Sequence, residues 1–176
     1  MGINNPPDRL DALPSVVPVF PLTSALLLPR GELPLNIFEP RYVSMIEDAL
    51  RADRIIGMLQ PQDDNSSLRP AIHSVGCIGK ITQFAETGDG RFMISLTGLC
   101  RFRVAEELTV ITSYRQCLVS YDEFARDLVE RDGEDLVNRP AILKALREFA
   151  EANRLKIDWK SIEQTPNEAI VNALSM

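Results

Sequence analysis

The sequence has few of the residues on which catalytic and metal centres are usually built. Among its 176 residues there is a single histidine, His73. One histidine argues against a hydrolase triad and against a histidine-rich metal site, and no G-x-S-x-G motif occurs. The segment from Gly76 to Lys80 lacks the Gly and the Ser or Thr that complete a phosphate loop. We therefore expect no enzyme activity, no cofactor and no metal ion.

The sequence also lacks an excess of positive charge and a long apolar run. It has 19 Lys and Arg against 25 Asp and Glu, a net charge of −6, whereas nucleic-acid surfaces need clustered Lys and Arg. No apolar run approaches the ~20 residues that span a bilayer. The first residues have neither the basic nor the apolar region of a secretory signal. These absences predict a cytoplasmic protein that binds neither nucleic acid nor membranes.

Cysteine is scarce and unpaired in the sequence. Cys77, Cys100 and Cys117 are odd in number and show no C-x-x-C spacing. Each lies in an apolar, strand-like stretch. We expect all three to be small buried hydrophobic residues.

Residues 17–46 predict a strand, a proline-bracketed loop, a second strand and a helix. The apolar run 17–20 is interrupted by proline, which suits an edge strand or a bulge. Residues 33–37 alternate between apolar and other side chains, the period of a half-buried strand. Pro40 stands where a first helical residue tolerates a missing N–H, and apolar residues follow at helical spacing.

Further short strands follow at regular spacing. They are expected at residues 55–59, 74–86, 92–97, from Phe102 onward, and 114–121. Thr87 to Gly90 has the residues of a hairpin turn, and Gly76 and Gly79 indicate a bulge or a close approach of another backbone. About seven strands with one early helix predict an α+β domain that is mainly β and barrel-like or sandwich-like.

Composition divides the chain into four parts. Residues 1–15 are polar and rich in turn formers, which predicts a loosely held arm. Residues 16–122 form the β-rich domain, and the charge-dense residues 123–139 predict a connection. Residues 140–176 predict a small helical subdomain. Its last apolar face stops in mid-pattern at the chain end, so we expect this subdomain to be incomplete and to pack on another surface, either of its own domain or of a second copy of the chain.

Two ordered blocks resemble the N-terminal domain of Lon proteases. The first block is Pro18 to Leu22, Leu28-Pro29 and Leu33 to Tyr42, and the second is Val75 to Ile81, Gly88 to Gly90, Leu96 to Leu99 and Arg101 to Val104. The resemblance covers residues 16–121 in detail and is closest to small free-standing proteins built from this domain. It implies a PUA-like pseudo-barrel with a part in substrate recognition. The ATPase and protease segments of Lon have no counterpart in the sequence.

One apolar stretch has two open interpretations. Leu26, Leu27, Leu28 and Pro29 stand in the loop between the first two expected strands. Loops usually expose their side chains, so these leucines either fold back on the core or present an apolar patch to a partner. In the second case they are the candidate polypeptide-binding patch.

The leading functional hypothesis is a non-catalytic polypeptide-binding or adaptor module. The resemblance implies it, and exposed apolar surface suits unfolded or flexible segments; a protease or a chaperone would be a natural partner. The alternative is a PUA-like module that binds a small molecule or RNA. Acidic charge and few aromatic residues count against RNA, whereas a cleft with converging polar groups would favour a small ligand.

Overall fold

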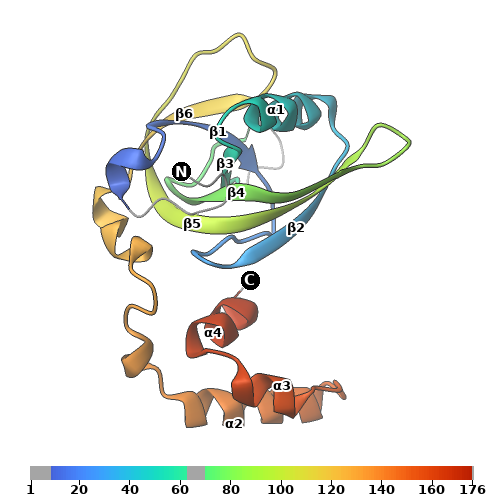
Figure 1. Ribbon diagram of the computed structural model, residues 1–176, viewed down its shortest axis with the longest axis vertical. Coiled ribbons are helices and arrows are strands. Elements are labelled where there is room, and N and C mark those ends of the chain that lie inside the picture. Colours follow the sequence, from blue (N-terminus) through green and yellow to red (C-terminus); the bar gives the residue numbers. More distant parts are fainter. Residues whose placement is uncertain (1–8, 63–69, 176) are drawn as a thin grey trace. The chain divides into compact units, whose positions relative to one another are not determined.

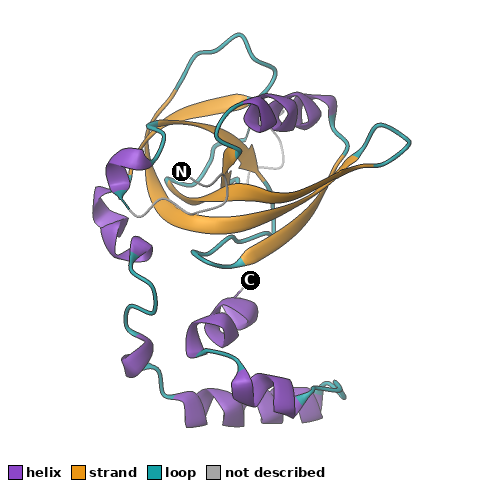
Figure 2. Ribbon diagram, viewed as in Figure 1, coloured by secondary structure: helices purple, strands orange, loops and turns teal. Residues whose placement is uncertain are grey.

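The computed structural model describes residues 9–62 and 70–175. The chain divides into two compact units, which we call the barrel unit, up to Val129, and the helical unit, from Glu130 to Ser175. The strands all lie in the barrel unit, and the helical unit contains helices (Figures 1 and 2). The expected α+β class, with a mainly β part followed by helices, is confirmed.

The strands of the barrel unit form one six-stranded sheet in the order β2-β5-β4-β3-β1-β6. They are β1 (Val16–Pro21), β2 (Glu32–Ile37), β3 (Ile55–Leu59), β4 (Val75–Glu86), β5 (Phe92–Glu107) and β6 (Arg115–Ser120). Because β6 also pairs with β5, the five strands other than β2 close into a ring. Closure removes the unpaired edges that an open sheet would expose.

β5 makes this closure possible by changing partners along its length. One side pairs with β4, while the other pairs with β2 over residues 92–97 and with β6 over residues 103–107. We expected two strands here, separated at Gly98, and that prediction is wrong. Gly98 instead lies opposite Gly79 at a shift in register, so the chain bulges and continues as one strand. In the part of the chain that the structure describes, six strands therefore replace the seven expected.

Two apolar clusters pack on the two faces of the strands, because successive side chains of a strand point to opposite faces. The cluster inside the ring includes Val17, Val19, Ile78, Phe102, Cys117 and Val119. The cluster on the outer face includes Phe20, Leu27, Met45, Ile56, Met58, Cys77 and Leu96. The expected close approach at the β4 glycines is confirmed, since a Cβ at Gly76 would lie 2.5 Å from the carbonyl oxygen of Met58. All three cysteines are buried, as expected, and none forms a disulfide bond within the described residues.

α1 (Pro40–Arg51) covers the outer cluster. It begins at Pro40, as the sequence predicted, and buries Tyr42, Met45, Ile46 and Ala49. Arg41 and Glu39 form an ion pair of 2.8 Å at the start of the helix. The phenol ring of Tyr42 stacks at 4.1 Å from the ring of Phe20 on β1, which fixes the helix to the sheet.

Two expectations about the flanks of the barrel differ from the structure. Residues 1–8 of the expected arm lie outside the described residues, but Leu13 is buried and the Tyr121 hydroxyl donates to the Pro14 carbonyl oxygen at 2.7 Å. The last residues of the arm are thus held against the barrel. Likewise, the expected connection does not begin at residue 123, because the 3-10 helix η2 (Asp122–Leu128) packs on β5.

The helical unit contains η3 (Glu134–Leu136), α2 (Arg139–Ala152), α3 (Trp159–Gln164) and α4 (Asn167–Ser175). Arg139 joins these elements by donating to the Ile162, Glu163 and Thr165 carbonyl oxygens at 2.7–3.0 Å. A guanidinium is well suited to this role, because it carries five N–H donors in a rigid plane. Within residues 9–62 and 70–175, no helix is both long and apolar enough to cross a membrane.

Candidate functional site

The loop between β1 and β2 carries the leucines and is hydrogen-bonded at both ends. We call residues 22–31 the leucine loop. At one end, the Gln60 side-chain amide donates to the Ala25 carbonyl oxygen at 3.4 Å. At the other end, the Arg30 backbone N–H donates to the Gly98 carbonyl oxygen at 2.8 Å, and the Gly98 N–H donates to the Gly31 carbonyl oxygen at 2.9 Å. The loop thus runs over the sheet from the end of β3 to the middle of β5.

Two glycines make room for this loop. Gly79 and Gly98 are cross-strand partners on β4 and β5. A Cβ at Gly79 would lie 2.7 Å from the Leu27 Cδ2 atom, and a Cβ at Gly98 would lie 2.0 Å from the Leu28 carbonyl oxygen. Neither distance is compatible with a real side chain, so the loop can settle on the sheet only where both strands have glycine.

The two interpretations of the leucines apply to different residues. Leu27 is 2% exposed and belongs to the outer apolar cluster, whereas Leu26 is 39% exposed. Leu28 and Pro29 are half-buried. Leu27 therefore anchors the loop, and Leu26 is the member of the predicted patch that is most available to a partner.

Beside the leucine loop the surface has a groove of about 300 Å³, which we call the leucine-loop groove. Its lining comes from three places: residues 25–28 of the loop, residues 58–60 at the end of β3, and residues 73–77 leading into β4. Arg101 completes the lining from β5. His73 precedes β4, and its backbone N–H donates to the Gln60 carbonyl oxygen at 3.0 Å. The groove is mainly apolar, with its fixed positive charge on the β5 side.

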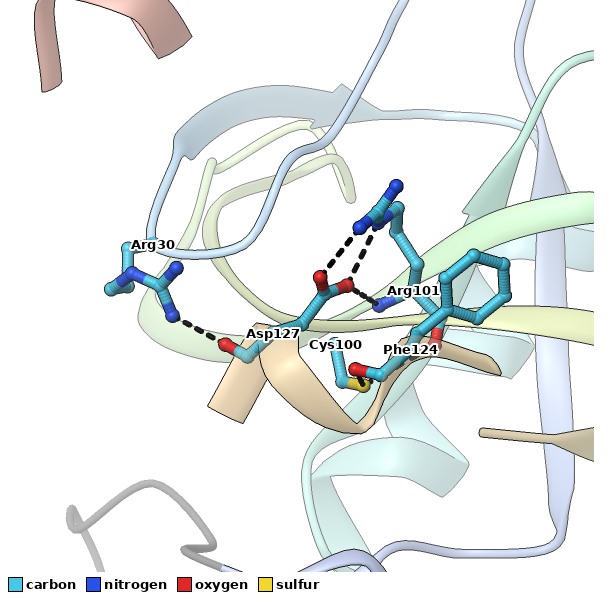
Figure 3. A network of polar contacts seen from close by, with 5 residues as sticks. All are labelled: Arg30, Cys100, Arg101, Phe124 and Asp127. Carbon is cyan, nitrogen blue, oxygen red and sulfur yellow. Dashed lines mark hydrogen bonds and ion pairs between the residues drawn. The ribbon is translucent and has the colours of Figure 1, made fainter. Parts of the chain in front are cut away.

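Arg101 is held in place by Asp127 of η2 (Figure 3). The Asp127 carboxylate accepts bonds from the Arg101 side chain, at 2.8 Å from Nε and 2.7 Å from Nη2, and from the Arg101 backbone N–H at 2.9 Å. The guanidinium also lies 4.8 Å from the centre of the Phe124 ring. Arg30 of the leucine loop donates from Nη1 to the Asp127 carbonyl oxygen at 2.5 Å. The loop, β5 and η2 therefore meet at a hydrogen-bonded corner.

The electrostatics of this corner favour an ionised Asp127. Burial by itself raises the pKa of Asp127, but the hydrogen bonds and positive charge of Arg101, with a smaller effect of Arg30, bring it below its ordinary value. The bond to Asp127 raises the pKa of Arg101. Burial raises the pKa of the nearby Cys100 thiol to about 12, so this sulfur is not a nucleophile at neutral pH.

The sequence alone did not identify Arg101 or Asp127 as part of a functional site. Arg101 stood in one of the blocks of the family resemblance, and Asp127 lay in a charge-dense segment where solvated carboxylates are the common case. No local signal separates Asp127 from the acidic residues around it. Within the described part of the chain, no group of three or more His, Cys, Asp or Glu side chains could hold a metal ion.

Two solved structures of Lon N-terminal domains are similar to this chain. A Lon N-terminal domain protein from Xanthomonas campestris is 30% identical in sequence, with a TM-score of 0.50, over 60% of this chain and 59% of that one. The N-terminal domain of the Lon protease of the Mycobacterium avium complex shares the fold, with a TM-score of 0.53 and 17% identity over 88% of this chain and 77% of that one.

Among curated proteins, the chain is similar to Lon protease 2 of Sorangium cellulosum, with 29% identity over 83% of this chain and 17% of that protein. Lon protease 2 of Myxococcus xanthus is 28% identical over 53% of this chain and 12% of its own length. The chain thus spans less than a fifth of these relatives. The family described as the ATP-dependent protease La (LON) substrate-binding domain matches residues 16–174, which include both units. The chain therefore belongs to the LON substrate-binding domain family.

Proposed function

We propose that this chain is a non-catalytic module that binds unfolded or flexible polypeptide segments in the leucine-loop groove. The observation that carries the proposal is the groove itself, about 300 Å³ in volume and bordered by the exposed Leu26 and Val75. Membership of a family described as substrate-binding supports it. A cavity of this size matches one large apolar side chain, and burying such a side chain is worth about 1.5–3 kcal/mol.

Binding of this kind suits an adaptor. A groove that takes one side chain gives weak and broad recognition, which is appropriate for segments exposed only when a protein is unfolded. The anchored Leu27 makes the groove wall rigid before binding, so little ordering free energy is lost there. We propose that the bound segments are passed to a cytoplasmic protease or chaperone partner, and that α4, with Leu174 53% exposed, takes part in self-association.

The test compares two charged substitutions at exposed apolar positions. Leu26→Asp lies on the groove, whereas Met93→Asp, at a residue that is 56% exposed, lies on β5 away from the groove lining. Binding to a fluorescently labelled, reduced and carboxymethylated protein is measured by anisotropy, with the native form of the same protein as a control. We expect binding to the unfolded form alone, weakened about tenfold or more by Leu26→Asp and little by Met93→Asp.

Three results would contradict this function. The first is equal binding by Leu26→Asp and the wild type. The second is a larger loss from Met93→Asp, which would move the binding surface to the far end of the sheet. The third is tight binding of a small metabolite that displaces the polypeptide, which would favour the small-molecule alternative.

A further inference from the structure

The lining of the leucine-loop groove differs in charge from one element to the next. The lining residues from the leucine loop and from residues 58–60 are neutral, and β5 contributes Arg101. None of the described residues that line it is acidic. In a chain with a net charge of −6, an apolar groove with an arginine and a histidine on its lining and no carboxylate is complementary to a negatively charged ligand.

Arg101 keeps hydrogen-bonding capacity beyond its bonds to Asp127. A guanidinium carries five N–H donors. The bonds from the Arg101 side chain to Asp127 use Nε and Nη2, and no hydrogen bond to a described residue uses Nη1. Asp127 balances much of the charge, but it also fixes the plane of the guanidinium, so the remaining donors are oriented before a ligand arrives.

Arg101 stands in a part of the groove wall that hydrogen bonds hold together. Asp127 of η2 accepts from Arg101, and the bond from Arg30 to the Asp127 carbonyl oxygen joins the leucine loop to η2 (Figure 3). A polypeptide that ends beside Arg101 offers it a terminal carboxylate, whereas the backbone of a segment that continues offers only neutral carbonyl oxygens.

From these observations we infer that the groove recognises polypeptide C-termini: the last apolar side chain enters the groove, and Arg101 binds the terminal carboxylate. This inference rests on the proposed function and specifies its substrate class. Asp127 is then a positioning residue, because it touches Arg101 and not the ligand. A charge-assisted hydrogen bond to a carboxylate contributes enough to change affinity about tenfold or more.

The experiment uses three labelled peptides with the same apolar sequence and measures each dissociation constant by fluorescence anisotropy. One ends in a free carboxylate, one in an amide, and one in an amide with an aspartate next to the last residue. Each is measured with the wild type, Arg101→Gln and the matched control Arg103→Gln. Arg103 lies on the same strand and also pairs with a carboxylate of η2, Glu123, but it does not line the groove.

We expect the wild type and Arg103→Gln to bind the free carboxylate about tenfold more tightly than the amide, and Arg101→Gln to bind both equally. Equal binding of acid and amide by the wild type would overturn the inference while leaving the proposed function intact. The inference would also be overturned if Arg101→Gln still bound the free carboxylate more tightly than the amide, or if the wild type bound the peptide with the internal aspartate tightly. Should Arg101→Gln fail to fold, the wild-type comparison of acid and amide still tests whether the protein recognises polypeptide C-termini. If the wild type binds none of the peptides, the proposed function fails as well.

Discussion

Gly79 of β4 lies directly opposite Gly98 of β5, and the leucine loop occupies the space that two side chains would otherwise fill. This pair explains how a loop with three consecutive leucines settles on the outer face of a barrel. The same pair marks the register shift at which β5 bulges between its β2-bonded and β6-bonded parts. Closure of the barrel and formation of the groove therefore depend on the same place in the sheet.

Gly98→Ala should destabilise the protein by about 3 kcal/mol, because the new Cβ would lie 2.0 Å from the Leu28 carbonyl oxygen, which is backbone and cannot rotate away. Urea denaturation measures the change in the free energy of unfolding. Gly88→Ala is the control, since nothing lies within 4 Å of a Cβ at that position. Equal stability of the two variants would show that the loop is not seated on β5.

Leu27→Ala should cost about 2–5 kcal/mol of unfolding free energy, because the 2% exposed side chain leaves a cavity in the outer cluster. The same substitution at Leu26, which is 39% exposed, should change stability by no more than about 0.5 kcal/mol. Chemical denaturation of both variants gives the comparison. A similar loss at both positions would mean that the loop buries both leucines.

The stabilisation from Asp127 should disappear in acid. Its folded pKa lies below the value of about 3.9 expected in the unfolded chain, so the folded protein binds fewer protons in this range and stability rises with pH. The contribution is complete above about pH 4 and is lost as the pH falls through the folded pKa. The difference in unfolding free energy between the wild type and Asp127→Asn should therefore be constant near neutral pH and shrink below about pH 4. A difference that does not change with pH would contradict this assignment.

A fragment of residues 1–129 should unfold cooperatively on heating, because the barrel unit ends at Val129. A fragment of residues 1–126 should have a lower Tm, since it removes Asp127 and leaves Arg101 without its carboxylate partner. Circular dichroism during heating measures both. Equal Tm values would show that the end of η2 contributes nothing, and a non-cooperative 1–129 fragment would show that the barrel depends on the helical unit.

The local pattern of residue types along the sequence was enough to predict several features of the structure. The helix beginning at Pro40, the hairpin turn at Thr87–Gly90 and the burial of the three cysteines all follow from residue type and spacing. Two ordered sequence blocks also indicated the family, because they preserve the turns and the apolar–polar alternation of one domain. These features depend on residues that are close together in the chain.

Only the tertiary structure decided which residues form the site. Leu26 and Leu27 are chemically identical neighbours, and one is exposed while the other is buried because a glycine pair more than fifty residues away leaves room for one side chain. Asp127 looks like any acidic residue of a solvated segment until η2 folds onto β5 and brings it to Arg101. Arg30 reaches it across 97 positions of sequence. Burial and charge pairing between residues so far apart in the sequence depend on how strands and loops meet in space. The periodicity of residue types along the chain does not contain this information.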